Sequence, residues 1–155
     1  MDTLAQKALN ILDSNLYINL ATSSLDGQPW NTPVYAVRDE DFNFYWRSWC
    51  GAEHSKNIQD NEKVFLTCYD STRDLGTNYQ RCVYIEGRAR KVMDDDRIKN
   101  ILPLFSNHRE DQLAEFLNGH CKAVYCCTPT RVWLNDMSEQ EVGEGTQSMR
   151  AQIPI

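Results

Sequence analysis

The sequence predicts an α+β domain in which a small antiparallel β-barrel carries peripheral helices. Two observations support this class: five or six short runs alternate apolar and polar residues as strands do, and helical patterns are inserted late in the chain. The chain has 155 residues, 41% of them hydrophobic and 25% charged, which suits one domain with a real core. No repeat or linker divides it. We expect a domain over residues 1–136 and a C-terminal arm, extended or disordered, over residues 137–155.

The first part of the chain predicts one helix and two strands. Asp2–Ser14 places apolar residues at helical spacing, and Leu16–Thr22 then alternates as a strand does. An Asp-Gly turn within Ser23–Pro29 leads into a second strand, Trp30–Val37. Because Pro33 has no amide proton, we expect this strand to lie at a sheet edge or to bulge there.

Three further strands and a short helix follow. We predict strands at Phe42–Ser48, Lys63–Asp70 and Arg81–Val92, with a short helix that ends near Asp60. Gly87 in the middle of the long fifth strand indicates a bend, a bulge or the close approach of another group. The polar residues 71–79 are predicted to form a loop.

Two helices and two strands complete the predicted domain. Asp94–Asp96 places carboxylates where a helix begins, which favours capping and complements the helix dipole. Another helix is predicted at Arg109–Asn118, ended by a glycine. The last strands are predicted at two ranges broken by Pro129, namely Cys121–Thr128 and Arg131–Asn135.

Charge and hydropathy restrict the possible partners. The formal net charge is -6, which argues against a general nucleic-acid binder because such proteins need a basic face that displaces counterions. Any anion site must therefore be local. No apolar run approaches the roughly 18 residues of a membrane span, and residues 1–7 lack the basic start and apolar core of a signal peptide. We expect a cytoplasmic protein that binds neither nucleic acid nor membrane.

Ser48–Asn57 links the third strand to the short helix and suits a phosphate group. Serine hydroxyls and free amides at a helix N-terminus donate hydrogen bonds, while Lys56 and Arg47 supply positive charge. The generic phosphate-loop pattern GxxxxGK[ST] is absent. The same two cations could therefore equally be solvated surface residues.

Six cysteines are present, and none forms a C-x-x-C pair, which argues against a zinc ribbon or a thioredoxin-like motif. Cys68 and Cys82 lie in strand patterns and are expected to be small buried apolar groups. Cys50 lies in the phosphate stretch, where a thiolate could be favoured, but we do not expect it to be catalytic. His120–Cys121 with Cys126–Cys127 matches no recognised ligand spacing, so we expect no metal site.

Short segments along most of the chain form an ordered set with a known counterpart. They are Leu20–Thr22, Asp26–Pro29, Pro33–Tyr35, Phe44–Trp46, His54–Ile58, Val83–Ala89 and Pro129–Trp133. Together they cover residues from about 16 to 133. In this order they resemble the pyridoxamine 5′-phosphate oxidase-like, FMN-binding split-barrel family.

The resemblance implies a six-stranded split β-barrel that forms a homodimer with FMN between the protomers. The segment matching Ser55–Lys56 would hold the phosphate, and the strand matching Asn31–Tyr35 would run beside the isoalloxazine ring. The implied function is that of a flavin-dependent oxidoreductase acting on a small-molecule substrate or electron donor. The implied cofactor-binding residues are Thr32, Pro33, Val34, Tyr45, Trp46, Arg47, Ser48, His54, Ser55, Lys56 and Asn57.

Two departures from the true oxidase argue against vitamin B6 oxidation. The arginine-rich second strand is replaced by Trp30–Pro33, and Met149–Ile155 does not match the basic substrate-binding C-terminus. No side chain stands out as a catalytic acid or base. The alternative is a non-enzymatic sensor or storage protein for a flavin or for haem, with His54, His108 or His120 as iron ligand.

Overall fold

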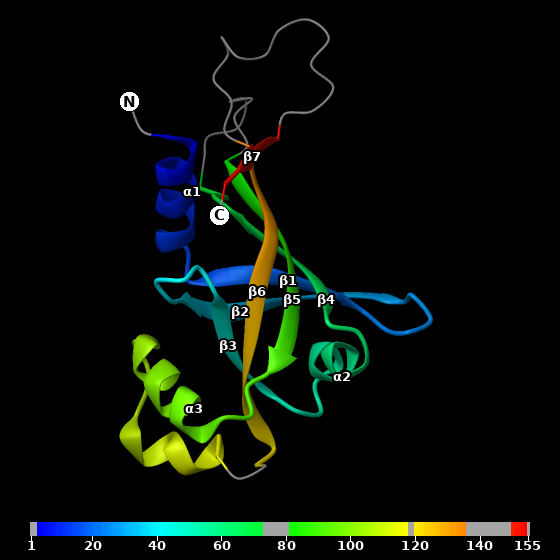
Figure 1. Cartoon of the computed structure of the whole chain (residues 1–155), viewed down its shortest axis with the longest axis vertical. Helices are drawn as coiled ribbons and strands as arrows, with labels where there is room; N and C mark the ends of the chain where they lie inside the picture. The colour runs from blue at the N-terminus through cyan, green and yellow to red at the C-terminus, as the bar shows by residue number, and fades with distance from the viewer. Residues whose placement is uncertain (1–2, 73–80, 118–119, 136–149, 155) are drawn as a thin grey trace, which may run out of the picture.

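Six antiparallel strands close into a barrel at the centre of the molecule (Figure 1). The computed structural model describes residues 3–72, 81–117, 120–135 and 150–154. The strands pair in the order β3-β2-β1-β4-β5-β6, and a pairing between β3 and β6 closes the ring. Their bounds are β1 Tyr17–Ser23, β2 Pro29–Arg38, β3 Phe44–Trp49, β4 Lys63–Tyr69, β5 Cys82–Lys91 and β6 Lys122–Asn135. The α+β antiparallel barrel predicted from the sequence is confirmed.

Three helices and two short 3-10 segments surround the barrel. Figure 1 shows α1 near one end of β6, with α2 and α3 near the other end. Their bounds are α1 Leu4–Asp13, α2 Glu53–Asp60, α3 Asp95–Ile101, η1 Leu102–Leu104 and η2 Glu110–Glu115. As predicted, an aspartate begins α3: the carboxylate of Asp94 accepts a hydrogen bond from the Arg97 amide at 2.6 Å. No helix in the described part of the chain is long and apolar enough to cross a membrane.

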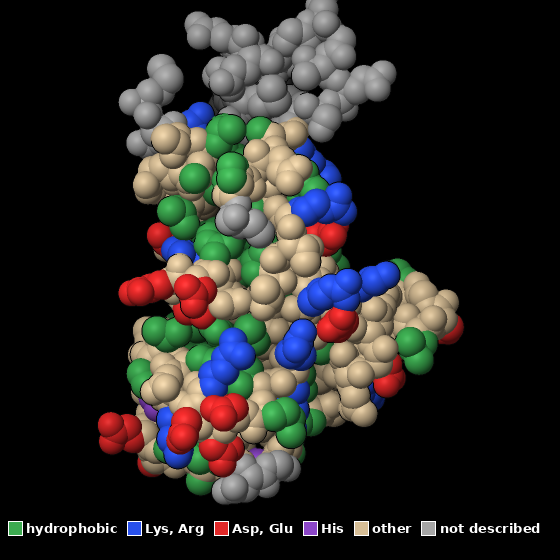
Figure 2. All heavy atoms as spheres, viewed as in Figure 1, with side chains coloured by type: hydrophobic (Ala, Val, Ile, Leu, Met, Phe, Trp, Pro, Cys, Tyr) green, Lys and Arg blue, Asp and Glu red, His purple; other side chains and the backbone are tan. Residues whose placement is uncertain are grey.

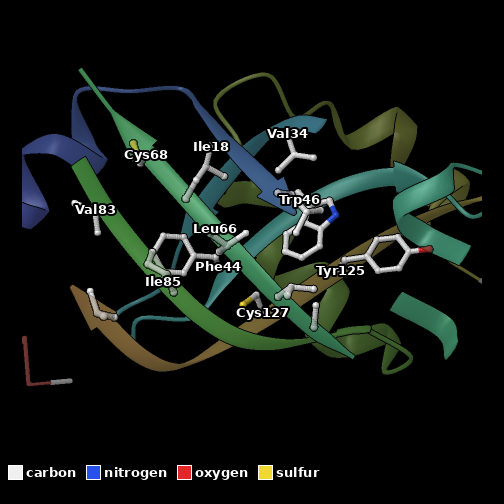
Figure 3. Close-up of a cluster of buried hydrophobic side chains, with 14 of the residues drawn as sticks. Ile18, Val34, Phe44, Trp46, Leu66, Cys68, Val83, Ile85, Tyr125 and Cys127 are labelled. Carbon is white, nitrogen blue, oxygen red and sulfur yellow. The ribbon is translucent and has the colours of Figure 1, made fainter. Parts of the chain in front are cut away.

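The barrel interior is filled by side chains that alternate along the strands (Figure 3). The strand predicted at Lys63–Asp70 is β4, and its side chains alternate: Val64, Leu66 and Cys68 are buried while their neighbours are not. At one end of this cluster the ring of Trp46 stacks on that of Tyr125, with centroids 5.9 Å apart. Buried side chains that meet in this way give the barrel wall a rigid backing.

One prediction about the last strands is wrong. Cys121–Thr128 and Arg131–Asn135 were expected to be separate, but β6 runs through Pro129 without a break. The register against β5 shifts between Glu86 and Gly87, so that one β6 residue, Thr130, lies opposite no residue of β5 in the strand pairing. In a bulge, not every residue donates a hydrogen bond to the neighbouring strand. A proline, which has no amide proton, is therefore tolerated there.

Gly87 lies where β5 and β6 come closest together. A Cβ atom at this residue would lie 2.5 Å from Cys127 Sγ and 2.9 Å from the Thr128 carbonyl oxygen. The bulge and the close approach expected at this glycine are both confirmed. The side chains of β6 also change face here, because Cys127 points inward before the bulge and Val132 after it.

The helix predicted at Arg109–Asn118 is present only as a shorter 3-10 helix, Glu110–Glu115. The segment forms the 3-10 turn η2, with hydrogen bonds from the Gln112 amide to Arg109 and from the Phe116 amide to Leu113. No side chain caps its start, and a helix of this length gains little on its own. Its position depends instead on Phe116, which packs into a second apolar cluster with residues of α3 and β3.

A break in the pairing of β2 gives the barrel its open side. Within the described residues, β3 pairs with Ala36–Arg38 of β2, whereas Pro29–Tyr35 pairs with β1 alone. The strand edge expected at Pro33 is therefore present. Beyond Trp46, β3 leaves β2 but stays paired with β6 as far as Trp49.

Charged side chains of both signs lie close together on the surface. On the face in Figure 2, lysine and arginine side chains lie beside aspartate and glutamate side chains rather than in a field of their own. Ion pairs such as Arg88–Glu62 and Arg131–Glu86 are examples. This face has no continuous basic surface of the kind that nucleic-acid backbones require.

We predict that Gly87→Ala lowers the free energy of unfolding by about 1–3 kcal/mol, because the added methyl group overpacks the contact with β6. Urea unfolding measures this change. Gly51→Ala is the matched control, since nothing lies within 4 Å of its Cβ position, and it should change stability by less than about 0.5 kcal/mol. Equal losses in the two variants would contradict the close approach.

Candidate functional site

The N-terminus of α2 lies just beyond the point where β3 leaves β2. Ala52 caps the helix without a side-chain hydrogen bond. Within the described residues, the amides of Glu53 and His54 form no backbone hydrogen bond, whereas those of Ser55 and Lys56 bond to the Ala52 carbonyl at 3.0 Å. Free amides at a helix start, together with the helix dipole, favour an anion.

Ser48 and His54 meet at this helix start. The Ser48 hydroxyl lies 2.6 Å from Nε2 of His54, so β3 and α2 are joined directly by a side-chain hydrogen bond. Burial lowers the pKa of His54, because a charged imidazole loses hydration in the protein interior. The neutral ring can therefore exchange hydrogen bonds with a hydroxyl at neutral pH.

Ser55 has a buried hydroxyl with unused hydrogen-bonding capacity. The residue is 2% exposed, and its Oγ has no hydrogen-bond partner in the described structure. Burial raises the pKa of Tyr125, and the nearby Ser55 hydroxyl partly offsets this rise. The geometry between the two hydroxyls is not that of a hydrogen bond, so Ser55 Oγ has no hydrogen-bond partner in the described structure. A buried hydroxyl without a partner costs free energy, and a bound anion would remove that cost.

Lys56 lies at the outer rim of this corner. Its side chain is 59% exposed, and its Nζ lies 3.5 Å from Oε2 of Glu53, one turn earlier in α2. The pair is a solvated one that contributes little to stability. The ammonium group can therefore move toward an anion at the helix start. We call Ser48, His54, Ser55 and Lys56 the anion corner.

Arg47 lies away from the anion corner. Its guanidinium packs over the ring of Phe105, 4.5 Å from the centroid, and donates a hydrogen bond to Asn107. Successive strand side chains point to opposite faces, so Arg47 and Ser48 leave β3 in opposite directions. The two cations that the sequence placed together, Arg47 and Lys56, are thus found in different surroundings.

Two other predicted residues of β3 have structural partners. The Tyr45 hydroxyl donates a hydrogen bond to Asp39 at 2.7 Å and accepts one from Arg97 at 3.0 Å, in the second cluster under α3. The pKa of Tyr45 is raised, first by burial and then by the Asp39 carboxylate. Trp46 lies in the barrel core with no exposed surface.

The predicted residues of β2 lie along its open edge, and Asn57 lies inside. Pro33 is exposed, Thr32 is half-buried, and Val34 packs into the barrel core. The Asn57 amide donates a hydrogen bond to the Thr22 hydroxyl at 3.0 Å, and both side chains are buried. Asn57 therefore fixes α2 to β1 below the anion corner.

The structure adds Lys91 to the surroundings of this helix start. Its Nζ lies 3.6 Å from Sγ of Cys50, although 41 residues separate the two. Nothing in the local sequence of Lys91 indicated this neighbour, since the contact depends on how β5, β6 and β3 pair. The thiols of Cys68 and Cys82 are buried, as expected, and burial raises the pKa of Cys68 to about 11.

The three histidines proposed as haem ligands lie in different environments. His54 belongs to the anion corner, and His120 is exposed beside Cys121. His108 has a buried Nδ1 without a hydrogen-bond partner in the described structure. Among the described residues, no three His, Cys, Asp or Glu side chains are grouped so that they could hold a metal ion.

An antiparallel barrel in which β3 pairs with β6 along its length, but with β2 only over Ala36–Arg38, has the architecture of the split-barrel class. The sequence model described as pyridoxamine 5′-phosphate oxidase matches residues 4–135. The chain therefore belongs to the pyridoxamine 5′-phosphate oxidase-like family. A comparison with curated proteins found no significant match.

Solved structures share this fold at low sequence identity. A haem-binding protein from Mycobacterium smegmatis superposes with a TM-score of 0.72 and 16% identity, over 99% of this chain and 58% of that one. The haem storage protein HutZ from Vibrio cholerae superposes with a TM-score of 0.69 and 15% identity, over 87% of this chain and 97% of that one. A pyridoxamine 5′-phosphate oxidase-like protein from Listeria innocua superposes with a TM-score of 0.62 and 16% identity, over 85% of this chain and 98% of that one. The chain spans less than two thirds of the first of these proteins, and the likeness shows the fold alone.

We predict that His54 titrates below its ordinary pKa of 6.5 and that stability follows this shift. The unfolded chain binds a proton at this residue near pH 6.5, whereas the folded chain binds it only at lower pH. The neutral ring thus contributes stability fully above about pH 6.5, and the contribution decreases as the pH falls toward the folded pKa. NMR titration of the ring protons measures the pKa, and His54→Gln should reduce the acid sensitivity of urea unfolding. A pKa at or above the ordinary value would contradict the burial.

Proposed function

We propose that this protein binds FMN, with the flavin phosphate in the anion corner, and that it is a flavin-dependent oxidoreductase acting on a small molecule. The observation that carries the proposal is the buried Ser55 hydroxyl, which has no partner in the described structure and lies in the first turn of a helix with free amides. A phosphate oxygen accepts hydrogen bonds from such donors. Bound FMN would supply the hydride chemistry, while the protein orients the substrate.

The anion corner contains one positive and one negative side chain near the proposed phosphate position. Lys56 supplies a cation at the rim, but Glu53 adds a carboxylate in the same turn. The Lys56 ammonium neutralises Glu53 while the site is empty and would turn to the phosphate when it is filled. We expect Glu53→Gln to strengthen FMN binding for the same reason.

The remaining residues of the proposed site lie along the opening of the barrel. The backbone of Thr32–Val34 lines the β2 edge, which has no strand partner on its outer side within the described residues. The isoalloxazine ring would lie along this edge. Trp30 and Trp49 are 47% and 59% exposed, and exposed aromatics beside an open edge support a second protomer that covers the ring. We therefore propose a homodimer.

The decisive experiment is an FMN titration of flavin-free protein carrying Ser55→Ala or Lys56→Ala. Ser55→Ala should raise the Kd for FMN about fivefold to tenfold while leaving the free energy of unfolding equal or higher, because it removes a buried hydroxyl that has no partner. Lys56→Ala should weaken binding by about 1.5 kcal/mol, the lower end for a charge-assisted contact, because its side chain is exposed.

Lys99→Ala is the matched control for the lysine variant. Its Nζ lies 3.0 Å from Asp96 in the same i,i+3 arrangement, but on α3. It should leave FMN binding unchanged. If the wild-type protein does not bind FMN, or if Ser55→Ala binds it with unchanged affinity, the assignment of the phosphate is wrong.

Haem is the second candidate, and the buried, unpartnered Nδ1 of His108 favours it. Two of the structural neighbours carry haem in their names. We predict that protein purified without added cofactor has the visible absorption of a flavin, bleached by a reduced nicotinamide donor, and no Soret band. A Soret band that shifts in His108→Ala would support haem ligation instead.

A further inference from the structure

A pocket of about 340 Å³ lies on the other side of β3 from the anion corner, where Arg47 lies. Residues of β1, β2, β3, η2 and β6 line it. Those that matter here are Tyr17, Tyr35, Arg47, Trp49, Phe116 and Lys122. Ser48 also lines this pocket, and its hydroxyl is bonded to His54, so the pocket and the anion corner are neighbours that share this residue. The pocket is large enough for a one- or two-ring molecule, at the small end of ligand sites.

The walls of this pocket are aromatic. Tyr17 and Tyr35 form a tilted pair with centroids 6.3 Å apart, and the Tyr35 hydroxyl is fixed by Ser106 at 2.9 Å. Trp49 and Phe116 add two further rings. Flat apolar faces of this kind accept a planar ligand through stacking and edge contacts.

Arg47 brings an incompletely paired charge to the pocket. No carboxylate in the described structure forms an ion pair with it, and its one hydrogen-bond acceptor is the neutral Asn107 amide oxygen. Two aromatic rings, Phe105 and Phe116, lie against the guanidinium. Burial lowers the pKa of Arg47, which shows that the charge is partly removed from water. A desolvated guanidinium with free N–H groups is a ready partner for a carboxylate.

The other charges of the pocket leave it net positive. Lys122 forms an ion pair with Glu115, and both residues line the pocket. Their charges cancel, so the lining carries the single positive charge of Arg47. The lining of this pocket is thus positively charged, although the net charge of the whole chain is -6.

We propose that this pocket binds a small planar aromatic carboxylate, with Arg47 as its counter-ion and the tyrosines as its walls. Anion binding itself does not require the flavin. That the bound carboxylate is the substrate of the flavin rests on the proposed function. The pocket thus assigns Arg47 to substrate binding rather than to the FMN phosphate.

The test is isothermal titration calorimetry of the flavin-free protein with 2-naphthoate and with its neutral analogue 2-naphthamide. We expect 2-naphthoate to bind at least tenfold more tightly than the amide, and Arg47→Gln to abolish that difference. Arg90→Gln removes an exposed arginine whose side chain is 74% exposed and pairs with Glu62, and it should leave binding unchanged.

A second variant moves affinity in the opposite direction and so cannot be explained by misfolding. Glu115→Gln removes the carboxylate that neutralises Lys122 and should tighten 2-naphthoate binding about threefold. Glu110→Gln, an exposed residue of the same 3-10 turn, is its control and should have no effect.

The outcomes separate this proposal from the assignment of FMN. Equal affinity for naphthoate and naphthamide, or no effect of Arg47→Gln, overturns the pocket. Displacement of 2-naphthoate by FMN also overturns it, since the pocket would then hold the flavin ring. If 2-naphthoate binds as expected while the protein refuses FMN, the pocket stands and the flavin assignment falls.

Discussion

The two faces of the candidate site depend on how β3 is paired. The strand is held by β6 along its whole length but by β2 only up to Trp46. From there to Trp49 it forms one side of an opening while its other edge remains fixed. Because successive side chains of a strand point to opposite faces, Ser48 lies on the side of α2 and Arg47 on the opposite side. Pairing the whole of β3 with β2 would close the opening between the two strands.

The rest of the barrel keeps that edge in place. Trp46, just before the opening, stacks on Tyr125 of β6, and both are buried. On the other side of β6, the contact at Gly87 and the unpaired Thr130 let β6 bend while it stays paired with β5. Asn57 ties α2 to β1 through Thr22. The polar groups at the opening therefore belong to elements that are each fixed by buried contacts, which is what a pre-organised site requires.

The sequence predicted the barrel well because its strands carry a strong period of two. The pattern of buried residues at Val64, Leu66 and Cys68 indicates a strand. The glycine in β5 indicates a bulge or a close approach, and both are found. Pro129 misled the prediction because a bulge, which depends on pairing with β5, makes the missing amide harmless. The apolar spacing of residues 109–118 predicted a longer helix than the 3-10 helix Glu110–Glu115, because a short segment without a side-chain cap depends on tertiary contacts. Of the loop predicted at residues 71–79, residues 73–79 fall outside the described residues, as do residues 137–149 of the arm. Ala151–Ile153 of the arm form β7, which pairs with β6.

The site could be predicted only where its residues are close in the sequence. Ser48, His54 and Ser55 lie within one strand-to-helix connection, so their hydrogen-bonding potential was visible in the chain. The separation of Arg47 from Ser48 was also implied, since neighbours on a strand face opposite ways, but composition alone grouped the cations. Asn107, Glu115 and Lys122 had no local signal, because folding alone brings η2 and β6 beside β3.

The two proposed anion sites lie on opposite sides of β3, an arrangement that would let an acidic chain hold two negatively charged ligands. Phosphate and carboxylate repel each other, and the repulsion grows as water is excluded. Here each charge would meet its own donors, the amides and Lys56 of α2 on one side and Arg47 on the other. The two sites share only Ser48, whose hydroxyl is already bonded to His54. Neutral His54 adds no positive charge between them at neutral pH, so the carboxylate's binding should depend on Arg47 rather than on the state of the anion corner.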